Sequence, residues 1–425
     1  MTFKKTILEN GLRVIMIPMA ENPSVTVLVM VQAGSKYETK EESGLSHFLE
    51  HMVFKGSAKR PKPSDISREL ESIGAQYNAF TGQEYTGYYA KADVRHAAKV
   101  VDVVSDMFLH PVFDQKEMEK EKGVIIEEIR MYNDLPQQRA AELLSELLYG
   151  DQPAGWNIAG NEQTVRSFTR EALMSYRTSA YTYPATTIVV SGSFKEDEMN
   201  DLIVKAFVGN PDKKTKSKLP VKEGQPSPRI LTSFKETDQT HLAIGFRTFS
   251  ILDPRIPTMN VLSTILGRGM SSRLFLKMRE ELGICYYIRA EHEPLTDHGY
   301  LNVSAGVDNS RVEEGIKGIL GECIRLKDEV VSEVELQKAK DYIAGTTMLS
   351  LETSDARAEF CGYQEILKGR VDLPETLIAR VRAVTAQDVQ NLAKDIFKDS
   401  SMNMVVVGKF KDDSTFKSYF TLGHL

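Results

Sequence analysis

Two histidines and a glutamate stand within five residues of this chain, in the segment HFLEH that begins at His47. On an α-helix, residues four apart point the same way, so the imidazoles of His47 and His51 can reach one metal ion. The carboxylate of Glu50 projects beside them and can take a proton from a water molecule at that metal. This spacing predicts a metal site with its own general base. The alternative is a surface helix with two incidental histidines.

The residues around this segment predict the helix that carries it. Apolar residues recur at spacings of three and four and form a stripe roughly opposite His47: Leu45, Phe48, Leu49, Met52 and Val53. Ser43 is the predicted N-cap, and Gly56 is the predicted stop. One face of this helix is therefore expected to pack on a core, while the other face carries the chemistry.

A catalytic zinc site normally needs a third protein ligand, and a second helix is the best source. The segment 117–132 has an amphipathic helical pattern, with an apolar side formed by Met118, Val124, Ile125, Ile129 and Tyr132. Glu121 and Glu128 fall within that side, whereas Glu127 falls toward the charged face. Because an unpaired buried charge is costly, Glu128 is expected to pair with a metal ion or with a Lys or Arg, or else to stay in contact with water on a loosely docked helix.

Length and composition limit the possible functions. A chain of 425 residues suggests two or more domains, and a net charge of −6 gives no basic footprint for nucleic acid. No apolar run reaches membrane-spanning length, and charged residues interrupt the N-terminal segment where a signal peptide would be apolar. Three widely spaced cysteines, Cys285, Cys323 and Cys361, form neither a disulfide framework nor a CxxC site. These features predict a cytoplasmic protein without nucleic-acid or membrane partners.

An internal duplication organises the chain. The segment IVVSGSFKED at Ile188 is repeated as MVVVGKFKDD at Met404, an offset of 216 residues. The same offset superposes two strand-like segments, at Ser24 and Thr240, and two helical patterns further along the chain. One offset that serves three places predicts two related domains, each of the α+β class.

These domains are predicted at residues 1–208 and 229–425, and the segment 209–228, rich in Pro, Lys, Gly and Ser, is the predicted linker. The offset also shows what the second domain lacks. The four candidate site residues of the first domain fall on residues that bind no metal: Ser263, Leu266, Gly267 and Ala344. The chemistry is therefore expected in the first domain.

Several longer motifs match one family when they are taken together. The chain resembles the pitrilysin, insulin-degrading-enzyme and mitochondrial processing peptidase family, the inverzincins that carry H-x-x-E-H. The resemblance rests on NGLRVI at Asn10, GLSHFLEHMVFKG at Gly44, GAQYNAFTGQEYTGYY at Gly74, EKGVIIEEIRMYND at Glu121 and SSRLFLKMREELGICYY at Ser271. The length resembles the short bacterial-type members.

The resemblance implies a fold and a metal site. Each domain would be a mostly antiparallel sheet packed with helices, and the chain would form half of a clamshell. His47, His51 and Glu128 would bind one zinc ion per subunit, and Glu50 would be the general base. Glu121 would orient a histidine ligand.

The resemblance also implies how substrate is bound. The strand edge formed by Asn78, Ala79, Phe80 and Thr81 would pair with an extended peptide. Arg279 and Tyr286 would reach the substrate carbonyl from the second domain, in the zinc site of a partner subunit, so a homodimer is expected. A heterodimer with a related subunit is the alternative. Asn78 could instead be a turn or strand-end residue, and Arg279 a helix-surface residue paired with a nearby glutamate.

The activity implied is that of a zinc metalloendopeptidase acting on peptides or unfolded polypeptide segments. Two alternatives stay open. One is a non-catalytic or co-catalytic subunit of a processing-peptidase-like complex, and the other is a zinc hydrolase with a non-peptide substrate.

Overall fold

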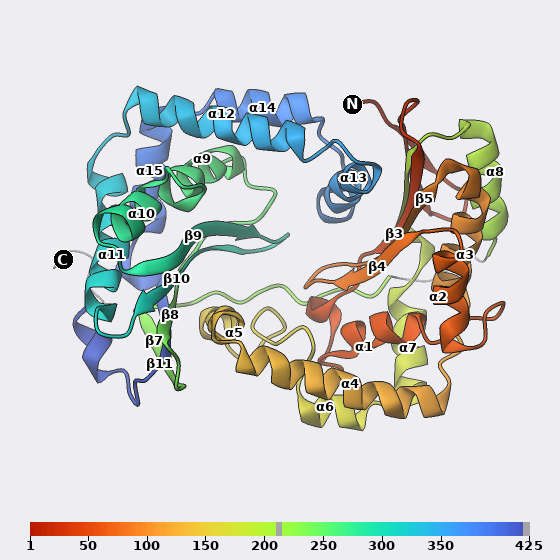
Figure 1. The fold of residues 1–425 in the computed structure, drawn as a ribbon, viewed down its shortest axis with the longest axis horizontal. Coiled ribbons are helices and arrows are strands. Elements are labelled where there is room, and N and C mark those ends of the chain that lie inside the picture. The colour runs from red at the N-terminus through yellow and green to blue at the C-terminus, as the bar shows by residue number, and fades with distance from the viewer. Residues whose placement is uncertain (210–214, 420–425) are drawn as a thin grey trace. The chain divides into compact units, whose positions relative to one another are not determined.

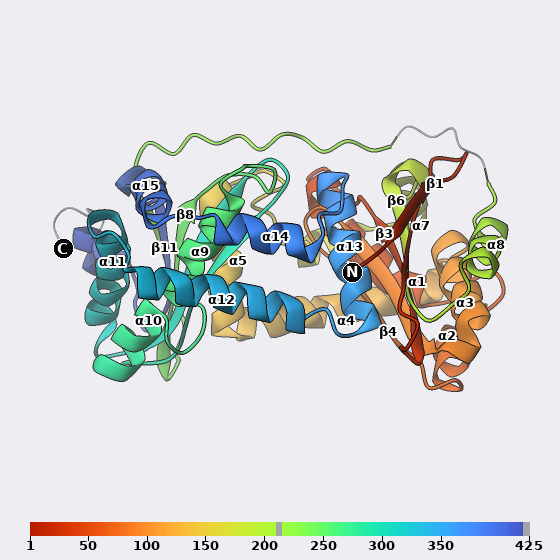
Figure 2. The same ribbon diagram turned by 90° about the horizontal axis from the view of Figure 1, so that it is seen from above.

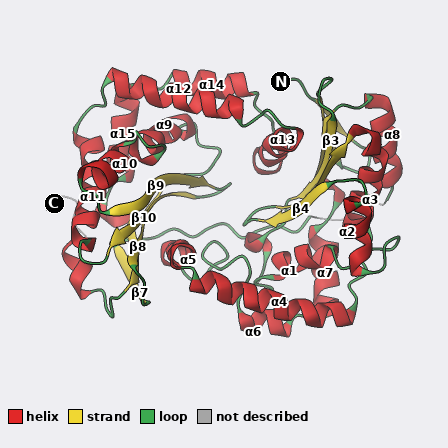
Figure 3. Ribbon diagram, viewed as in Figure 1, coloured by secondary structure: helices red, strands yellow, loops and turns green. Residues whose placement is uncertain are grey.

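The structure, a computed structural model, describes residues 1–209 and 215–419 and divides into two compact units. Each unit contains one mostly antiparallel sheet packed with helices, which confirms the predicted α+β class (Figure 3). Unit 1 comprises Met1–Ile129, Trp156–Leu219 and Met348–Asp372, and unit 2 comprises the remaining segments, which begin at Arg130, Pro220 and Leu373.

The sheet of unit 1 has six strands in the order β1-β2-β6-β3-β5-β4. Their bounds are β1 (Lys4–Ile7), β2 (Arg13–Pro18), β3 (Ser24–Val31), β4 (Gln76–Thr81), β5 (Thr86–Asp93) and β6 (Thr186–Gly192). β2 and β6 pair in parallel, and the other neighbours pair antiparallel. β4 is a terminal strand of this sheet, so one of its edges is unpaired within the described sheet.

Alternate residues of these strands face two different sets of helices. One sheet face packs against helices of the first half of the chain: α1 (Leu45–Val53), α2 (Pro63–Glu71), α3 (Ala97–Leu109), α4 (Gln115–Asp134), α6 (Glu162–Ser167), α7 (Arg170–Ala180) and α8 (Glu196–Ala206). The other face, which includes Ile15, Leu28 and Val189, packs against α13 (Ser354–Lys368).

Unit 2 is built on the same plan. Its sheet has the order β7-β11-β8-β10-β9, with strands β7 (Arg229–Phe234), β8 (Gln239–Arg247), β9 (Cys285–Pro294), β10 (Gly299–Asp308) and β11 (Met402–Gly408). One face packs mainly against α9 (Ile256–Gly267), α10 (Arg273–Phe275), α11 (Val312–Asp328), α12 (Glu333–Leu349), α14 (Pro374–Arg382) and α15 (Ala386–Ile396). The other face packs against α5 (Pro136–Tyr149).

The structure supports the duplication at residue level. Shifted by 216 residues, the bounds of β2, β6 and α7 coincide with those of β7, β11 and α15. The predicted strands at Ser24 and Thr240 are β3 and β8, which lie inside the two sheets. The repeat seen in the sequence is therefore a repeat of elements in the same order.

The two units exchange one helix. The offset places α5 over residues 352–365, which include most of α13, yet α5 packs on unit 2 and α13 packs on unit 1. In Figures 1 and 2, α13, blue because it comes late in the chain, lies beside the red and orange strand β3. Gly362 of α13 faces Met30, and Leu144 of α5 faces Gly245 of β8. The compact units therefore cut across the sequence ranges 1–208 and 229–425, whose boundaries stay a prediction about the duplication.

Polar contacts hold the exchanged helix α13 on unit 1. Its Ser354 hydroxyl lies 2.8 Å from the hydroxyl of Thr26, and Lys91 donates to Asp355 at 2.7 Å. At its other end the buried Glu365 pairs with Lys5 at 2.7 Å. These contacts show that α13 is an integral part of unit 1.

The predicted linker, the cysteines and the absence of membrane-spanning segments can each be compared with the described residues. Residues 210–214 of the predicted linker lie outside the described residues; Lys216 contacts Glu42 at 2.5 Å within unit 1, and Val221 belongs to unit 2. The three cysteines are buried free thiols. Within the described residues, no helix is both long and apolar enough to cross a membrane.

Candidate metal centre

The histidine segment lies on helix α1, as predicted. All five residues of its apolar stripe are buried against the sheet of unit 1. His47, Glu50 and His51 lie on the opposite side and are partly exposed. The helical phase read from the sequence is therefore correct, and the chemical groups face away from the core.

The beginning of α1 differs from the prediction. The N-cap is Gly44, with φ of +95°, and Ser43 makes no capping hydrogen bond. The buried carboxylate of Glu38 instead accepts the N–H groups of Gly44 at 2.8 Å and Ser46 at 2.6 Å. Burial raises the pKa of Glu38 to about 7, although the hydrogen bonds from Ser46 and Gly44 act in the opposite direction. A side chain six residues upstream thus replaces the expected local cap.

The second glutamate helix is α4, and its buried side differs by one position from the prediction. Val124 is 52% exposed, and Ile126 is buried in its place. Glu121 is buried, Glu127 is exposed and Glu128 is partly buried. The structure therefore places Glu128 nearer the buried side of α4 than Glu127, as the helical phase predicts, whereas the predicted stripe includes Val124 in place of Ile126.

Three potential ligand atoms converge between α1 and α4. One atom from each of His47, His51 and Glu128 lies within 4.8 Å of the others. The Nε2 atoms of His47 and His51 lie 3.7 and 3.5 Å from Oε2 of Glu128. Ligands of a tetrahedral zinc ion, at 2.0–2.2 Å from the metal, stand about 3.4 Å apart. The three residues therefore fit a zinc ion with one coordination position left open.

Glu121 and Lys55 hold the second histidine in place. Nδ1 of His51 lies 2.9 Å from Oε1 of Glu121, which directs Nε2 toward Glu128. Lys55 contacts the other oxygen of Glu121 at 2.7 Å. Burial raises the pKa of Glu121, but the hydrogen bonds from His51 and Lys55 outweigh it, so the net shift is downward. Lys55 was not singled out from the sequence, although it follows His51 by four residues.

The two histidines have different surroundings. Burial lowers the pKa of His47 to about 3, and the charge of His51 acts in the same direction. This imidazole is therefore neutral near pH 7, as a metal ligand must be. Burial also lowers the pKa of His51, but Glu121, Glu128 and Glu50 together raise it above its usual value. Buried Nδ1 of His47 has no hydrogen-bond partner among the described residues.

The candidate base, Glu50, receives a hydrogen bond from a neighbouring strand. The hydroxyl of Thr81 donates to Oε2 of Glu50 at 2.5 Å. Burial raises the pKa of Glu50, the hydrogen bond from Thr81 and the charge of His51 lower it, and the charge of Glu128 raises it. The net shift is upward, which moves Glu50 toward the range where a general base works near neutral pH.

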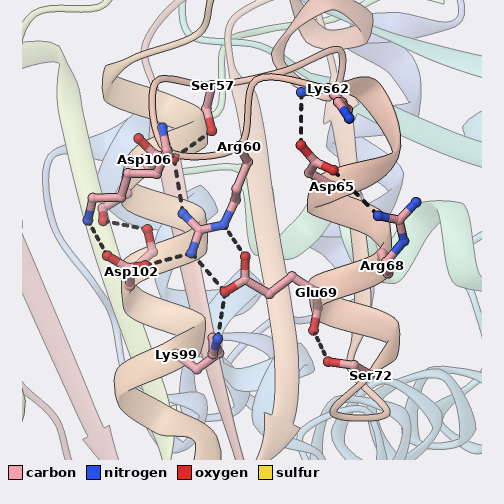
Figure 4. Close-up of polar contacts among 12 residues, drawn as sticks. Ser57, Arg60, Lys62, Asp65, Arg68, Glu69, Ser72, Lys99, Asp102 and Asp106 are labelled. Atoms are coloured by element: carbon pink, nitrogen blue, oxygen red, sulfur yellow. Dashed lines mark hydrogen bonds and ion pairs between the residues drawn. The ribbon is translucent and has the colours of Figure 1, made fainter.

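An ionic cluster fixes the chain that leaves α1 (Figure 4). Arg60 donates to Glu69 of α2 at 2.5 Å and to Asp102 of α3 at 2.6 Å. It also donates to the buried Asp106 at 3.0 Å, and Lys99 donates to Glu69 at 2.6 Å. The cluster ties the loop after α1 to the two helices that precede and follow β4 and β5. Sequence patterns gave no sign of it, because the partners are spread over 47 residues.

The proposed substrate strand is β4. Asn78 and Ala79 pair with Tyr89 and Tyr88 of β5, and β4 is at the end of the sheet order. Asn78 is exposed, and its side chain accepts a hydrogen bond from the N–H of Ala79 at 2.9 Å. Asn78 is thus a strand residue and not a turn residue.

Arg279 and Tyr286 lie together in unit 2. Arg279 belongs to a π-helical turn, η4 (Leu276–Glu281), a conformation that often marks functional sites. Its guanidinium lies 5.7 Å from the ring centre of Tyr286 and donates to the carbonyl oxygen of that residue at 3.2 Å. Tyr286 is 73% exposed, whereas the hydroxyl of Tyr287 contacts His241 at 2.9 Å. In the described part of the chain no glutamate pairs with Arg279.

Comparisons with known proteins identify the family of this chain. The family model of insulinase (peptidase family M16) matches residues 13–162, and the model of the peptidase M16 inactive domain matches residues 167–343. A protein of Bacillus subtilis, uncharacterized zinc protease YmxG, is 35% identical over 93% of this chain and 96% of its own length. Uncharacterized zinc protease SCO5738 of Streptomyces coelicolor is 29% identical over 97% of this chain and 90% of its own length.

Solved structures show the same fold. A protease from Helicobacter pylori superposes with a TM-score of 0.90 at 21% identity, covering 96% of this chain and 99% of that chain. A peptidase M16 inactive domain from Pseudomonas fluorescens superposes with a TM-score of 0.89 at 17% identity, covering 96% and 98%. At these identities the likeness concerns the fold. Together with the sequence matches, it shows that the chain is a short, bacterial-type member of the insulinase family, peptidase family M16.

Proposed function

We propose that this chain is a zinc-dependent endopeptidase that hydrolyses peptides or unfolded polypeptide segments. The observation that carries the proposal is the convergence of His47, His51 and Glu128. The carboxylate of Glu50 lies on α1, the helix that carries the two histidines. Relatives of this chain carry the name uncharacterized zinc protease, which also supports the proposal. One zinc ion per subunit is the proposed content.

Each residue of the site has a proposed role. A bound zinc ion would lower the pKa of a coordinated water toward neutrality and polarise the scissile carbonyl. Glu50 accepts the proton of the attacking water and passes it to the leaving amine. Glu128 offsets part of the metal charge, and Glu121 keeps His51 in the orientation and tautomer that a ligand needs.

The substrate is proposed to bind as an added strand. The free edge of β4, with Asn78, Ala79, Phe80 and Thr81, offers backbone groups to an extended peptide. This mode selects chains that are unfolded or locally extended, because a folded segment has its backbone groups already paired. It favours a peptide over a small non-peptide substrate.

Arg279 and Tyr286 are proposed to complete the site of a second subunit. The exposed Tyr286 and the guanidinium beside it could stabilise the oxyanion that forms on the substrate carbonyl. A chain that carries both this pair and the metal ligands would then work as a homodimer. A heterodimer in which this chain is a co-catalytic subunit is the second candidate, and the match of residues 167–343 to an inactive domain keeps it open.

The test uses the purified protein alone on a mixture of internally quenched peptides. Cleavage that a chelator abolishes and that zinc restores, at one zinc per chain, supports the endopeptidase. Zinc binding without cleavage, followed by cleavage when a related subunit is added, supports the co-catalytic role. Cleavage that survives complete removal of metal rules out both.

A mixing experiment tests the homodimer. Glu50→Gln and Arg279→Ala proteins are expected to be inactive alone, and they are mixed after dissociation of the subunits. When equal amounts are mixed, half of the dimers contain one subunit of each variant. If Arg279 acts in the partner's site, each mixed dimer has one intact site out of two, so about a quarter of the wild-type activity returns. No recovery, with exchange of subunits verified, excludes action between subunits.

A further inference from the structure

The hydrogen bond between Thr81 and Glu50 joins two elements that are far apart in sequence. Glu50 lies on α1 and Thr81 is the last residue of β4. The hydroxyl donates to Oε2 of Glu50 at 2.5 Å, and both residues are partly buried. Thr81 is thus a neutral donor, from outside the proposed ligand set, that contacts one oxygen of the carboxylate.

The position of Thr81 is itself well fixed. It pairs directly with Thr86 across the β4–β5 hairpin, and the turn is closed by a hydrogen bond from the N–H of Gly82 to Tyr85 at 2.8 Å. The hydroxyl of Thr86 donates to the carbonyl of Ala33 at 2.9 Å and anchors the hairpin to the chain after β3. Because threonine is β-branched, its side chain has few rotamers in a strand. The hydroxyl is therefore presented to Glu50 from a rigid frame.

We propose that Thr81 is a positioning residue for the general base. By holding Oε2 of Glu50, it leaves Oε1 as the oxygen that receives the proton. Since Thr81 also ends the strand on which the peptide is proposed to lie, one element sets both the path of the substrate and the direction of the base. This inference rests on the proposed function, and it assigns Thr81 a role beyond lining the substrate strand.

The test compares Thr81→Val, which keeps the shape and loses the donor, with Thr81→Ser, which keeps the donor. A matched control is Thr187→Val on β6, because the buried hydroxyl of Thr187 has no hydrogen-bond partner within residues 1–209 and 215–419. Thr81→Val is expected to lower kcat about 10- to 100-fold, since a small misorientation of a catalytic group costs this much. KM and the zinc dissociation constant should stay within about twofold. Thr81→Ser should keep kcat within about threefold of wild type, and Thr187→Val should change nothing.

Three results of the steady-state kinetics would overturn the inference. They are an unchanged kcat in Thr81→Val, a rise in KM alone, which would make Thr81 a substrate-binding residue, and an equal loss of kcat in Thr81→Ser, which would exclude the hydroxyl as the cause. Thermal unfolding of each variant separates these results from a loss of folded protein. A fall in zinc affinity that accounts for the lost activity also counts against the inference.

A second readout does not depend on peptidase activity. The protein is loaded with cobalt(II), whose visible absorption bands report on the surroundings of the metal. Thr81→Val is expected to shift these bands in the direction that Glu50→Gln shifts them, whereas Thr81→Ser and Thr187→Val leave them in place. If the wild-type protein cleaves no peptide, the proposed function fails and this spectrum still tests the inference. Bands of Thr81→Val that coincide with those of wild type refute it.

Discussion

The two repeats place different residues at equivalent positions of equivalent helices. In unit 1, His47, Glu50 and His51 lie on the partly exposed face of α1. In unit 2, the residues 216 positions later are Ser263 and Leu266, which are 1% and 0% exposed, and the buried Gly267. The second repeat therefore has neither the ligands nor an exposed helix face at these positions.

Close packing accounts for the buried helix face of unit 2. A Cβ atom built on Gly267 would lie 2.4 Å from the backbone nitrogen of Ala290 on β9. Strand β9 is the terminal strand of its sheet, as β4 is in unit 1. In unit 1, α1 reaches its edge strand through the long side chain of Glu50, whereas in unit 2 helix and strand meet backbone to backbone. The distance between this helix and the edge strand therefore distinguishes the repeat that holds the candidate site from the repeat that does not.

The largest expected effect concerns the base that unit 2 replaces with Leu266. Glu50→Gln should lower peptidase activity by about 10³-fold or more, because the amide cannot accept the proton of the attacking water. Zinc content should stay at the wild-type value, since Glu50 is not a ligand in the proposed site. Peptide cleavage and zinc content are measured on the same sample of Glu50→Gln. Full peptidase activity in this variant would exclude Glu50 as the general base.

The next effect separates the two neighbouring glutamates of α4. Glu128→Gln should weaken zinc binding by about 100-fold or more, because the site loses a charged ligand. Glu127→Gln is the matched control, since the side chain of Glu127 is on the exposed side, and it should stay within about twofold. Competition with a chromogenic chelator measures both. Equal losses in the two variants would contradict the helical phase seen here.

The third prediction probes the closed space of unit 2. Gly267→Ala should cost about 1–3 kcal/mol of unfolding free energy, because the added methyl group meets the backbone of β9. Gly345→Ala on α12, where a Cβ meets nothing within 4 Å, should instead stabilise by about 0.5–1 kcal/mol. Urea unfolding measures both variants. A neutral Gly267→Ala would show that unit 2 keeps room at this position.

The smallest effect concerns the way each helix begins. α1 is capped by the buried Glu38, whereas α9 starts at Ile256 with a proline in its first turn and no side-chain cap. Glu38→Ala should destabilise the protein by about 1–2 kcal/mol, since it leaves the N–H groups of Gly44 and Ser46 unpaired. Ser43→Ala, at the N-cap predicted from the sequence, should change stability by less than about 0.5 kcal/mol. Thermal unfolding compares the stability of the two variants. A larger loss of stability in Ser43→Ala than in Glu38→Ala would support Ser43 as the cap of α1.

Sequence periodicity could predict α1 and the face on which its histidines lie, because that information is local. It also distinguished Glu128 from Glu127, although it assigned Val124 to the buried side, where the structure has Ile126. An error of this size in the helical phase is expected because Val124 and Ile126, which are both apolar, lie on either side of the centre of the stripe.

The contacts that complete the site could not be predicted in this way. The hydrogen bond between Thr81 and Glu50 joins residues 31 positions apart, and the contact between Glu121 and His51 joins residues 70 positions apart. Each depends on how helices and strands pack, which a local pattern does not contain. The resemblance to a family supplied Glu121, and neither source supplied Lys55 or Glu38.

The exchange of α5 and α13 has a consequence for the origin of the chain. A single repeat made alone would leave one face of its sheet uncovered, and its own α5 or α13 would lack the sheet on which it packs. Two such chains could each pack the helix of the other on its sheet and so form a domain-swapped dimer. If residues 209–228 joined the two chains, the same exchange of helices would take place within one chain. A protease that nicks this connection should therefore produce two fragments that still purify together, each held by the helix it lends.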